Sequence, residues 1–361
     1  PLCVQAAVTL IDRICPDAKR LLLIPENHTR NLFYLQNVAQ IAAILRLTGL
    51  DVRIGSLLPE IVKPTPVGLP DGTTLLLEPL VRSRHRLGLA GFEPCAILLN
   101  NDLSAGIPEI LKDLDEQVVL PPLHAGWAVR RKSNHFAAYD QVAGDFARLV
   151  GIDPWRINPY FSVCDSVNFH ERQGEECLAA NVDAVLELIR EKYRQYGIDE
   201  TPYVVVKADA GTYGMGVMTV KDASQVTGLN RRQRNKMSVI KEGLAVSQVI
   251  IQEGVHSYEV VGSGKQEGVA EPVVYMIDRF VVGGFYRVHS GRGRDENLNA
   301  PGMHFERLAF ETSCSLPDQC QNPDAAPNRF YAYGVVARLA QLAASLELER
   351  TAPVAEELAC A

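Results

Sequence analysis

A glycine-rich segment between two apolar runs constrains this chain more than any other feature. The β-branched run Val204–Val206 is typical of a strand, Lys207 follows it, and Gly211, Gly214 and Gly216 precede a second apolar run. Glycine lets backbone N–H groups approach an anion without a Cβ in the way, and successive N–H groups in such a loop form an anion-binding concavity. The segment is therefore predicted to be a hairpin over phosphate groups, with Lys207 adding a point charge.

Two common phosphate-binding motifs do not fit this segment. A P-loop requires GxxxxGK[ST], in which the lysine follows the glycines, whereas Lys207 precedes them. The dinucleotide fingerprint requires GxGxxG at the start of a helix, whereas this order is GxxGxG and strand-like residues follow. When these residues are taken alone, an ordinary glycine-rich turn with an exposed lysine explains them equally well. The neighbouring segments must therefore decide between this interpretation and a phosphate-binding hairpin.

The next apolar run breaks into a polar turn. Val249–Ile251 is predicted to be a buried strand, and Gln252 and Glu253 follow it directly. A strand of this kind can present backbone groups and a carboxylate to an adenine and a ribose. An ordinary strand end is the alternative interpretation.

Two later segments contain candidate metal ligands. Residues 271–288 are predicted to form two antiparallel strands whose acids, with Arg287, point to one crevice, and residues 295–302 form a polar loop dense in oxygen atoms. Mg2+ prefers carboxylate and amide oxygens, and it keeps waters and substrate phosphates as its other ligands. The predicted metal ligands are a subset of Glu271, Asp278, Glu296, Asn297 and Asn299. A surface loop with structural asparagines is the alternative.

The N-terminal part has the pattern of a parallel sheet. The apolar run 21–24 is predicted as a strand, the periodic residues from 32 to 45 as a helix, and 50–54 as the next strand. A further buried strand is predicted at 96–99, whereas the Pro- and Gly-rich residues 55–90 are predicted as loops and edge structure. Alternation of strand and helix favours a parallel sheet covered by helices.

The predicted fold class is therefore α/β with α+β elements, in three parts. The pair Pro121-Pro122 marks a boundary, so residues 1–122 are predicted as an N-terminal α/β domain. Residues 123–200 form a helical linking subdomain with an amphipathic helix at 181–196. Residues 201–361 form the catalytic region, with the glycine-rich hairpin and a final helix from about 329 to 349.

Composition excludes several classes of function. The net charge is −7, and the one dense basic run, 230–236, is predicted as a solvated segment or a lid over phosphates, so no nucleic-acid partner is expected. No apolar stretch is long enough for a membrane span, and the first residues lack a signal-peptide pattern. The eight cysteines form no CxxC pair, which is typical of reduced thiols in a cytoplasmic protein.

The order of these segments resembles the ATP-grasp fold. The glycine hairpin after Lys207, the hinge strand at Gln252 and the strands with Arg287 follow one another as in that fold, and Lys132 stands where it carries its other ATP lysine. The amino-acid sequence is similar to that of a small bacterial family of glutamate–cysteine ligases at residues 207–216, 271–279 and 297–303. The resemblance implies an N-terminal pre-ATP-grasp-like domain and an ATP-grasp-like region. It also implies these ATP contacts: Lys132, Lys207, Gly211, Thr212, Tyr213, Gly214, Met215, Gly216, Gln252 and Glu253.

The resemblance implies the first step of glutathione synthesis. The γ-carboxylate of glutamate would attack the γ-phosphate of ATP, and the amine of cysteine would then attack the acyl phosphate. Charge neutralisation would come from Mg2+, Lys132 and Lys207, and the closing hairpin would exclude water. Lys207 and Arg287 are the predicted catalytic residues, with Arg287 holding a substrate α-carboxylate. A homo-oligomer is compatible with the sequence.

One departure from the ATP-grasp pattern leaves alternatives open. Many of these ligases carry an acid and a Glu-x-Asn metal motif after the last long helix, whereas here Glu347-Leu348-Glu349-Arg350 is followed by no asparagine. Another ATP-grasp ligase, such as a glutathione synthetase-like or dipeptide ligase, is one alternative. A regulatory protein that binds ATP without catalysis is the other.

Overall fold

The computed structural model describes residues 2–27, 31–210, 216–238, 246–262, 264, 267–307 and 329–353. The chain divides into two compact units, Pro1–Val129 and Arg130–Ala361, and each is described by itself. The division into three domains that the sequence suggests stays a prediction.

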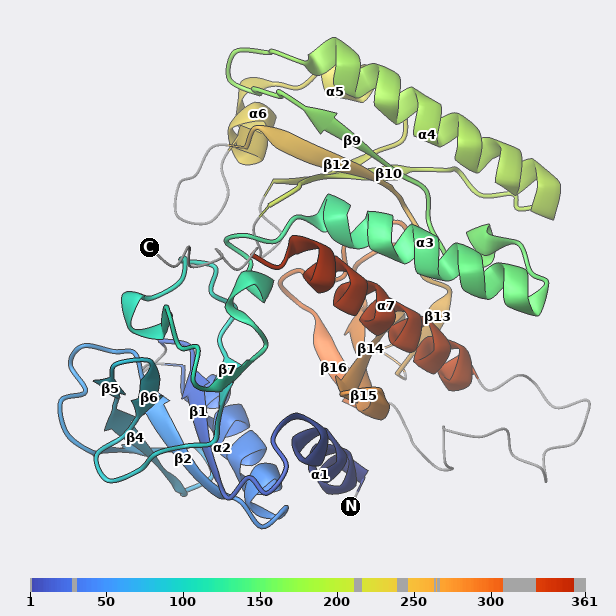
Figure 1. The fold of residues 1–361 in the computed structure, drawn as a ribbon. Coiled ribbons are helices and arrows are strands. Elements are labelled where there is room, and N and C mark those ends of the chain that lie inside the picture. The colour runs from blue at the N-terminus through green and yellow to red at the C-terminus, as the bar shows by residue number, and fades with distance from the viewer. Residues whose placement is uncertain are drawn as a thin grey trace, which may run out of the picture. The chain divides into compact units, whose positions relative to one another are not determined.

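The N-terminal unit is built on a six-stranded sheet with the order β3-β4-β2-β1-β7-β8 (Figure 1). All neighbouring strands run parallel except the edge pair β3–β4. The strands are β1 (Arg20–Pro25), β2 (Asp51–Ser56), β3 (Thr65–Gly68), β4 (Thr74–Pro79), β7 (Ala96–Asn100) and β8 (Val118–Leu120). The predicted parallel sheet is confirmed. The segment predicted as loops and edge structure contains the edge strand β3 and its neighbour β4, as well as a small hairpin of β5 (Val81–Ser83) and β6 (Arg86–Gly88).

The central strand β1 is buried on both faces. Leu21 and Leu23 pack with residues of α1 (Leu2–Ile14) and α2 (Leu32–Arg46). Leu22 and Ile24 pack on the other face, which the β6–β7 connection and a short 3-10 helix (Glu109–Leu111) help to cover. A parallel strand that is covered on both faces must be apolar at every position, which explains the uninterrupted run at 21–24.

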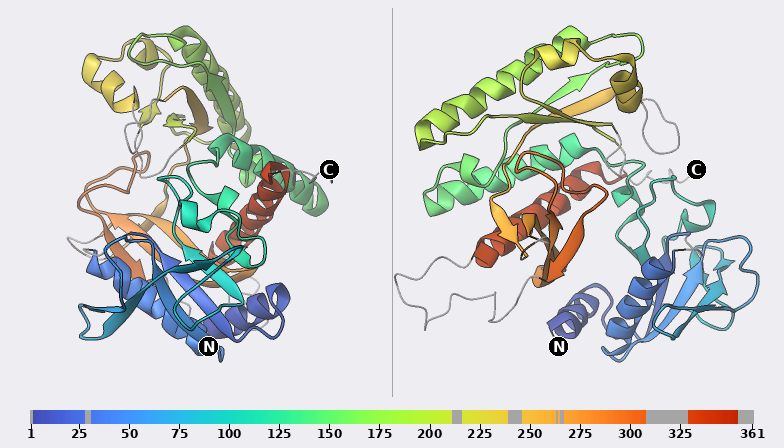
Figure 2. Two further views of the ribbon diagram at one scale, coloured as in Figure 1. Left: turned by 60° about the vertical axis from the view of Figure 1, so that its left-hand side comes forward. Right: turned by 180° about the vertical axis from the view of Figure 1, so that it is seen from behind.

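The C-terminal unit contains a four-stranded antiparallel sheet with the order β11-β10-β12-β9. Its strands are β9 (Phe161–Asp165), β10 (Val204–Ala208), β11 (Val217–Val220) and β12 (Gln248–Glu253). One face packs on α4 (Glu175–Tyr196) through Val204, Val206 and Ala208. Figure 2 shows α4 along the sheet with α5 (Ser224–Thr227) beside it, and the basic run forms most of α6 (Arg231–Ser238). The opposite face of this sheet, away from α4, is called the open face below.

A second antiparallel sheet has the order β13-β14-β15-β16. It consists of β13 (Glu259–Val261), β14 (Gly268–Ile277), β15 (Phe280–His289) and β16 (His304–Arg307), which confirms the two strands predicted at 271–288. Beside it lie α3 (Lys132–Val150) and α7 (Arg329–Thr351), which pack through small residues such as Ala138, Ala143 and Ala343. Among the described helices, none combines the length and apolar character needed to cross a bilayer.

Candidate functional site

Strand alternation places Lys207 and Gln252 together on the open face. Val206 and Ala208 of β10 and Ile251 of β12 belong to the core under α4. Side chains alternate along a strand, so Lys207, between the first two, and Gln252, after the third, point to the opposite face. The Nζ of Lys207 donates a hydrogen bond to Oε1 of Gln252 over 2.7 Å. Burial lowers the pKa of Lys207. The side chain is therefore half-buried on the open face and holds a charge that an anion would stabilise.

Lys132 stands at the first turn of α3 and reaches the end of β10. Its backbone N–H donates to the carbonyl of Asp209 over 3.0 Å, and its Nζ donates to the carbonyl of Ala208 over 2.8 Å. Burial lowers the pKa of Lys132 to about 8; Asp209 opposes this shift, and the positive charge of Lys207 adds to it. The two lysines that are predicted to contact ATP are thus electrostatic neighbours, and their contact with ATP stays a prediction.

Asp209 is a site residue that the sequence analysis missed. It is fully buried, and its carboxylate accepts hydrogen bonds from the N–H of Ser133 over 2.8 Å and from its hydroxyl over 2.7 Å. These bonds satisfy donors at the start of α3 that have no partner within the helix. The sequence shows an acid directly after the strand that bears Lys207, which could have indicated a site residue. Its partner, Ser133, lies 76 residues earlier, so no local pattern links the two.

The glycine-rich segment connects two antiparallel strands, as predicted. β10 pairs with β11, and the N–H of Ala208 donates to the carbonyl of Gly216 over 3.0 Å, with Gly216 at a φ of +61°. Residues Gly211, Thr212, Tyr213, Gly214 and Met215 lie outside the described residues. Their contacts with ATP stay a prediction.

Glu253 points away from the lysines, contrary to its predicted contact with a ribose. Its carboxylate accepts hydrogen bonds from Nε1 of Trp155 over 3.0 Å and from the N–H of Tyr160 over 2.8 Å. Burial raises the pKa of Glu253, and these two hydrogen bonds oppose the shift. Because Gln252 and Glu253 are consecutive in a strand, only one of them can share the face of Lys207. Glu253 therefore stabilises the 155–160 segment instead.

Three predicted metal ligands line one pocket of about 770 Å³ beside β11. They are Glu296, Asn297 and Asn299, and the pocket also contains Thr219 of β11 and Met237 of α6. An ion pair between Lys221 and Asp295 joins the end of β11 to their loop. The carboxylate of Glu296 accepts the N–H of Gly293 over 2.7 Å, and Oδ1 of Asn297 accepts the N–H of Asn299 over 2.9 Å.

The other two predicted ligands lie elsewhere and apart from each other. Glu271 is opposite Arg287 in the β14–β15 ladder and accepts a hydrogen bond from its Nη1 over 2.6 Å. Asp278 lies in the turn between the same strands with a φ of 52°. Six residues of β14 lie between Glu271 and Asp278, which places the two roughly 20 Å apart, so the prediction that they point to one crevice is wrong. In the described part of the chain, no three acids, histidines or cysteines gather closely enough to hold a metal.

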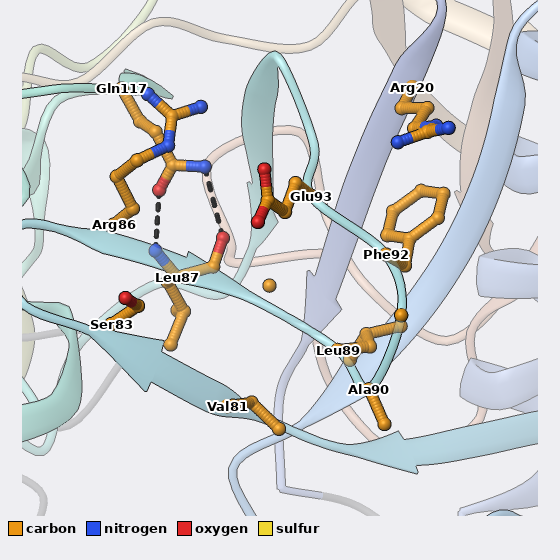
Figure 3. A pocket seen from close by; sticks show the side chains of 12 residues that line it. Arg20, Val81, Ser83, Arg86, Leu87, Leu89, Ala90, Phe92, Glu93 and Gln117 are labelled. Atoms are coloured by element: carbon orange, nitrogen blue, oxygen red, sulfur yellow. Dashed lines mark hydrogen bonds between the residues drawn. The ribbon is translucent and has the colours of Figure 1, made fainter.

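A second pocket, of about 410 Å³, lies in the N-terminal unit (Figure 3). Gln117 forms part of its wall and exchanges two hydrogen bonds with the backbone of Leu87, while Arg20 and Phe92 lie on another side. Arg20 begins β1, so the pocket is at the amino end of that strand. Ligands of parallel sheets usually bind at the carboxyl ends, and none of the predicted site residues lines this pocket.

Comparison with known proteins decides between the alternatives. A family model described as "Glutamate-cysteine ligase" matches residues 1–348. The chain belongs to the glutamate–cysteine ligase family. A crystal structure from Methylobacillus flagellatus KT, named "Putative gamma-glutamylcysteine synthetase", is 64% identical with a TM-score of 0.87, over 97% of this chain and 82% of that one.

More distant structures share little with this member of the glutamate–cysteine ligase family. VanG D-Ala:D-Ser ligase from Enterococcus faecalis is 11% identical with a TM-score of 0.46, over 90% of this chain and 82% of that one. D-cycloserine synthetase DcsG is 13% identical with a TM-score of 0.42, over 91% of this chain and 82% of that one. Among curated proteins, no match was found.

Membership of the glutamate–cysteine ligase family confirms three predictions from the sequence. The resemblance to this family is correct, the chain is an ATP-dependent ligase, and the mixed α/β fold is the one expected. The individual residue roles stay predictions, and the geometry above supports some of them more than others.

Proposed function

We propose that this chain joins the γ-carboxylate of L-glutamate to the amine of L-cysteine through an acyl phosphate formed with ATP. The observation that carries the proposal is the pair of half-buried lysines, Lys132 at the start of α3 and Lys207 of β10, whose charges repel near the end of β10. Two neighbouring cations in a partly desolvated place stabilise the charge that develops on a transferring phosphoryl group. The half-buried Val205 offers apolar surface beside them.

Arg287 supplies the cation for a substrate carboxylate in this proposal. Its Nη1 is bonded to Glu271, but its Nε is buried without a hydrogen-bond partner among the described residues. Leaving a buried donor unsatisfied costs about 1–3 kcal/mol. A planar carboxylate can satisfy two donors of one guanidinium, so a substrate carboxylate would remove that cost.

In this proposal, the Mg2+ that such a reaction requires would bind in the pocket beside β11. Glu296 provides a carboxylate and Asn299 an amide there, which are the hard oxygen donors that Mg2+ accepts. With few protein carboxylates in the pocket, most of the coordination would come from phosphates and water. The metal would neutralise phosphate charge, while Lys132 and Lys207 hold the remaining oxygens.

Phosphate release by the purified protein tests the proposed function. With MgATP, strong release is expected only when glutamate and cysteine are both present, together with the mass of γ-glutamylcysteine. Release with another pair of substrates would keep the fold and the lysine roles but refute the substrate assignment. ATP binding with no release under any pairing would favour a regulatory protein.

The proposal also predicts how ATP affinity depends on pH. Lys132 loses its proton as the pH rises through about 8, below its ordinary value of 10.5. Bound phosphates favour the charged lysine, so ATP binding should take up a proton as the pH rises above about 8, and the affinity for ATP should fall over that same range. Calorimetric titration in buffers of different ionisation enthalpy measures this uptake. Lys132→Met should abolish it, and equal proton uptake by the variant would contradict the assignment.

We also assign the chain to the cytoplasm, as the sequence predicts. The five cysteines that the structure describes, at positions 3, 15, 95, 164 and 177, carry free thiols, which supports a reducing compartment. Small molecules are the expected partners, and a homo-oligomer stays a prediction.

A further inference from the structure

Glu347 is a buried carboxylate outside every predicted contact. It lies on α7 with 1% of its side chain exposed, and its two oxygens are bound to residues more than two hundred positions earlier in the chain. Nε of Arg130 donates to Oε1 over 2.7 Å, and Nη2 donates to Oε2 over 2.5 Å. Nδ1 of His135 lies 3.1 Å from Oε2. The position that lacks a Glu-x-Asn motif in the sequence thus contains a carboxylate with a different set of partners.

The residues that Glu347 holds lie on both sides of Lys132. Arg130 precedes Lys132 by two residues, and His135 follows it by three, within the first turn of α3. A bidentate arginine–carboxylate pair fixes orientation as well as distance. Asp209 holds Ser133 of the same turn from the side of β10. The turn that bears Lys132 is therefore fixed by one carboxylate from β10 and by another from α7.

Attachment of α7 to α3 does not by itself require this carboxylate. Figures 1 and 2 show the two helices side by side, and Leu339 and Ala343 of α7 pack with Ala138 and Ala143 of α3. A buried ion pair is often no more stabilising than apolar residues of similar volume. The buried charge of Glu347 is therefore explained better by a role in holding the first turn of α3 than by a role in stabilising the fold.

Lys132 has a particular need for a fixed backbone. Lysine carries its charge on a flexible four-carbon stem, and Lys207 repels it from the neighbouring strand. Errors of about 1 Å in such a group can cost about a hundredfold in rate. Without Glu347, the guanidinium of Arg130, which is 19% exposed, would also lose its two bonds to this carboxylate two residues from Lys132.

We propose that Glu347 is a positioning residue, which holds the Arg130–His135 turn so that Lys132 meets the phosphates of a bound nucleotide. The inference rests on the proposed contact of Lys132 with ATP. It adds to the nucleotide site a residue of the C-terminal helix that touches neither substrate nor nucleotide.

The test compares Glu347→Gln with Glu349→Gln, an exposed acid two residues further along α7. Calorimetric titration with MgATP alone should show about tenfold weaker binding for Glu347→Gln and no change for Glu349→Gln. The KM for ATP should rise in parallel, while the KM values for glutamate and cysteine stay within about twofold. Unchanged ATP binding by Glu347→Gln would overturn the inference without affecting the proposed reaction.

Two further variants separate positioning from stability. In a Lys132→Met background, Glu347→Gln should weaken ATP binding no further, because its effect passes through Lys132; additive losses would overturn the inference.

The pair Arg130→Met with Glu347→Met should restore folding if Glu347→Gln unfolds the chain. Under the inference this double variant binds ATP about tenfold more weakly than the original chain, and full affinity would refute it. If the original chain, without any substitution, does not bind ATP at all, both the inference and the nucleotide role of the lysines are refuted.

Discussion

Lys207→Ala should lower kcat/KM by about a thousandfold, because a cation fixed on a desolvated sheet face is lost from the phosphoryl-transfer step. Lys207 lies within β10, and its Nζ is held by Gln252 at 2.7 Å. Since burial lowers the pKa of this lysine, the folded chain bears a cost for its charge, and removal of that charge offsets part of the lost packing. The free energy of unfolding should therefore change far less than the activity.

Steady-state kinetics and urea unfolding of the same preparation measure the two effects. Lys112→Met is the matched control, because Lys112 is 48% exposed and pairs only with Glu109 of its own turn among the described contacts. The control should retain full activity. A Lys207→Ala enzyme within tenfold of the original activity would refute the placement of phosphates on the open face.

Gly254→Ala should have the largest effect on stability, a loss of about 3 kcal/mol. A Cβ at this position would lie 2.0 Å from the ring of Tyr203. The ring cannot move aside freely, because the Tyr203 hydroxyl donates to the carbonyl of Val255 over 2.9 Å and the Tyr203 carbonyl accepts the N–H of Gly254 over 2.8 Å. The strain would also reach Gln252, two residues earlier, so ATP binding should weaken too.

The control for this substitution has the opposite expected sign. Gly144 lies inside α3 with no atom within 4 Å of a Cβ, so Gly144→Ala should raise the free energy of unfolding by up to about 1 kcal/mol. Chemical denaturation of both variants measures the difference. Equal stabilities would show that the close approach of Gly254 to Tyr203 is relaxed in solution.

The sequence predicts those parts of the fold that depend on local patterns. The run 21–24 predicts a buried strand, which the structure shows to be covered on both faces, and the glycines after Lys207 predict the hairpin between β10 and β11. The sequence of the segment from Lys207 to Gly216 resembles that of the glutamate–cysteine ligase family, and the family model over residues 1–348 confirms this resemblance.

Side-chain direction and long-range partners could not be predicted in this way. β12 contains an apolar run, Val249–Ile251, that does not alternate with polar residues, so the sequence does not show whether Gln252 or Glu253 shares the face of Lys207. Asp278 lies in the turn and Glu271 lies far along β14, and this placement depends on the register of β14 and β15. Asp209 and Glu347 find their partners 76 and 217 residues away, where no local pattern reports them.

The hydrogen bonds between Lys132 and the end of β10 have a consequence for how the enzyme can move. The backbone of Lys132 is bonded to Asp209, and its Nζ to Ala208, so the start of α3 and the strand that carries Lys207 are tied at several points. Any hinge motion that admits nucleotide must then carry both lysines as one rigid block. Nucleotide entry and product departure would depend on segments that swing against this block, and the distance between the two charges would stay constant through the catalytic cycle.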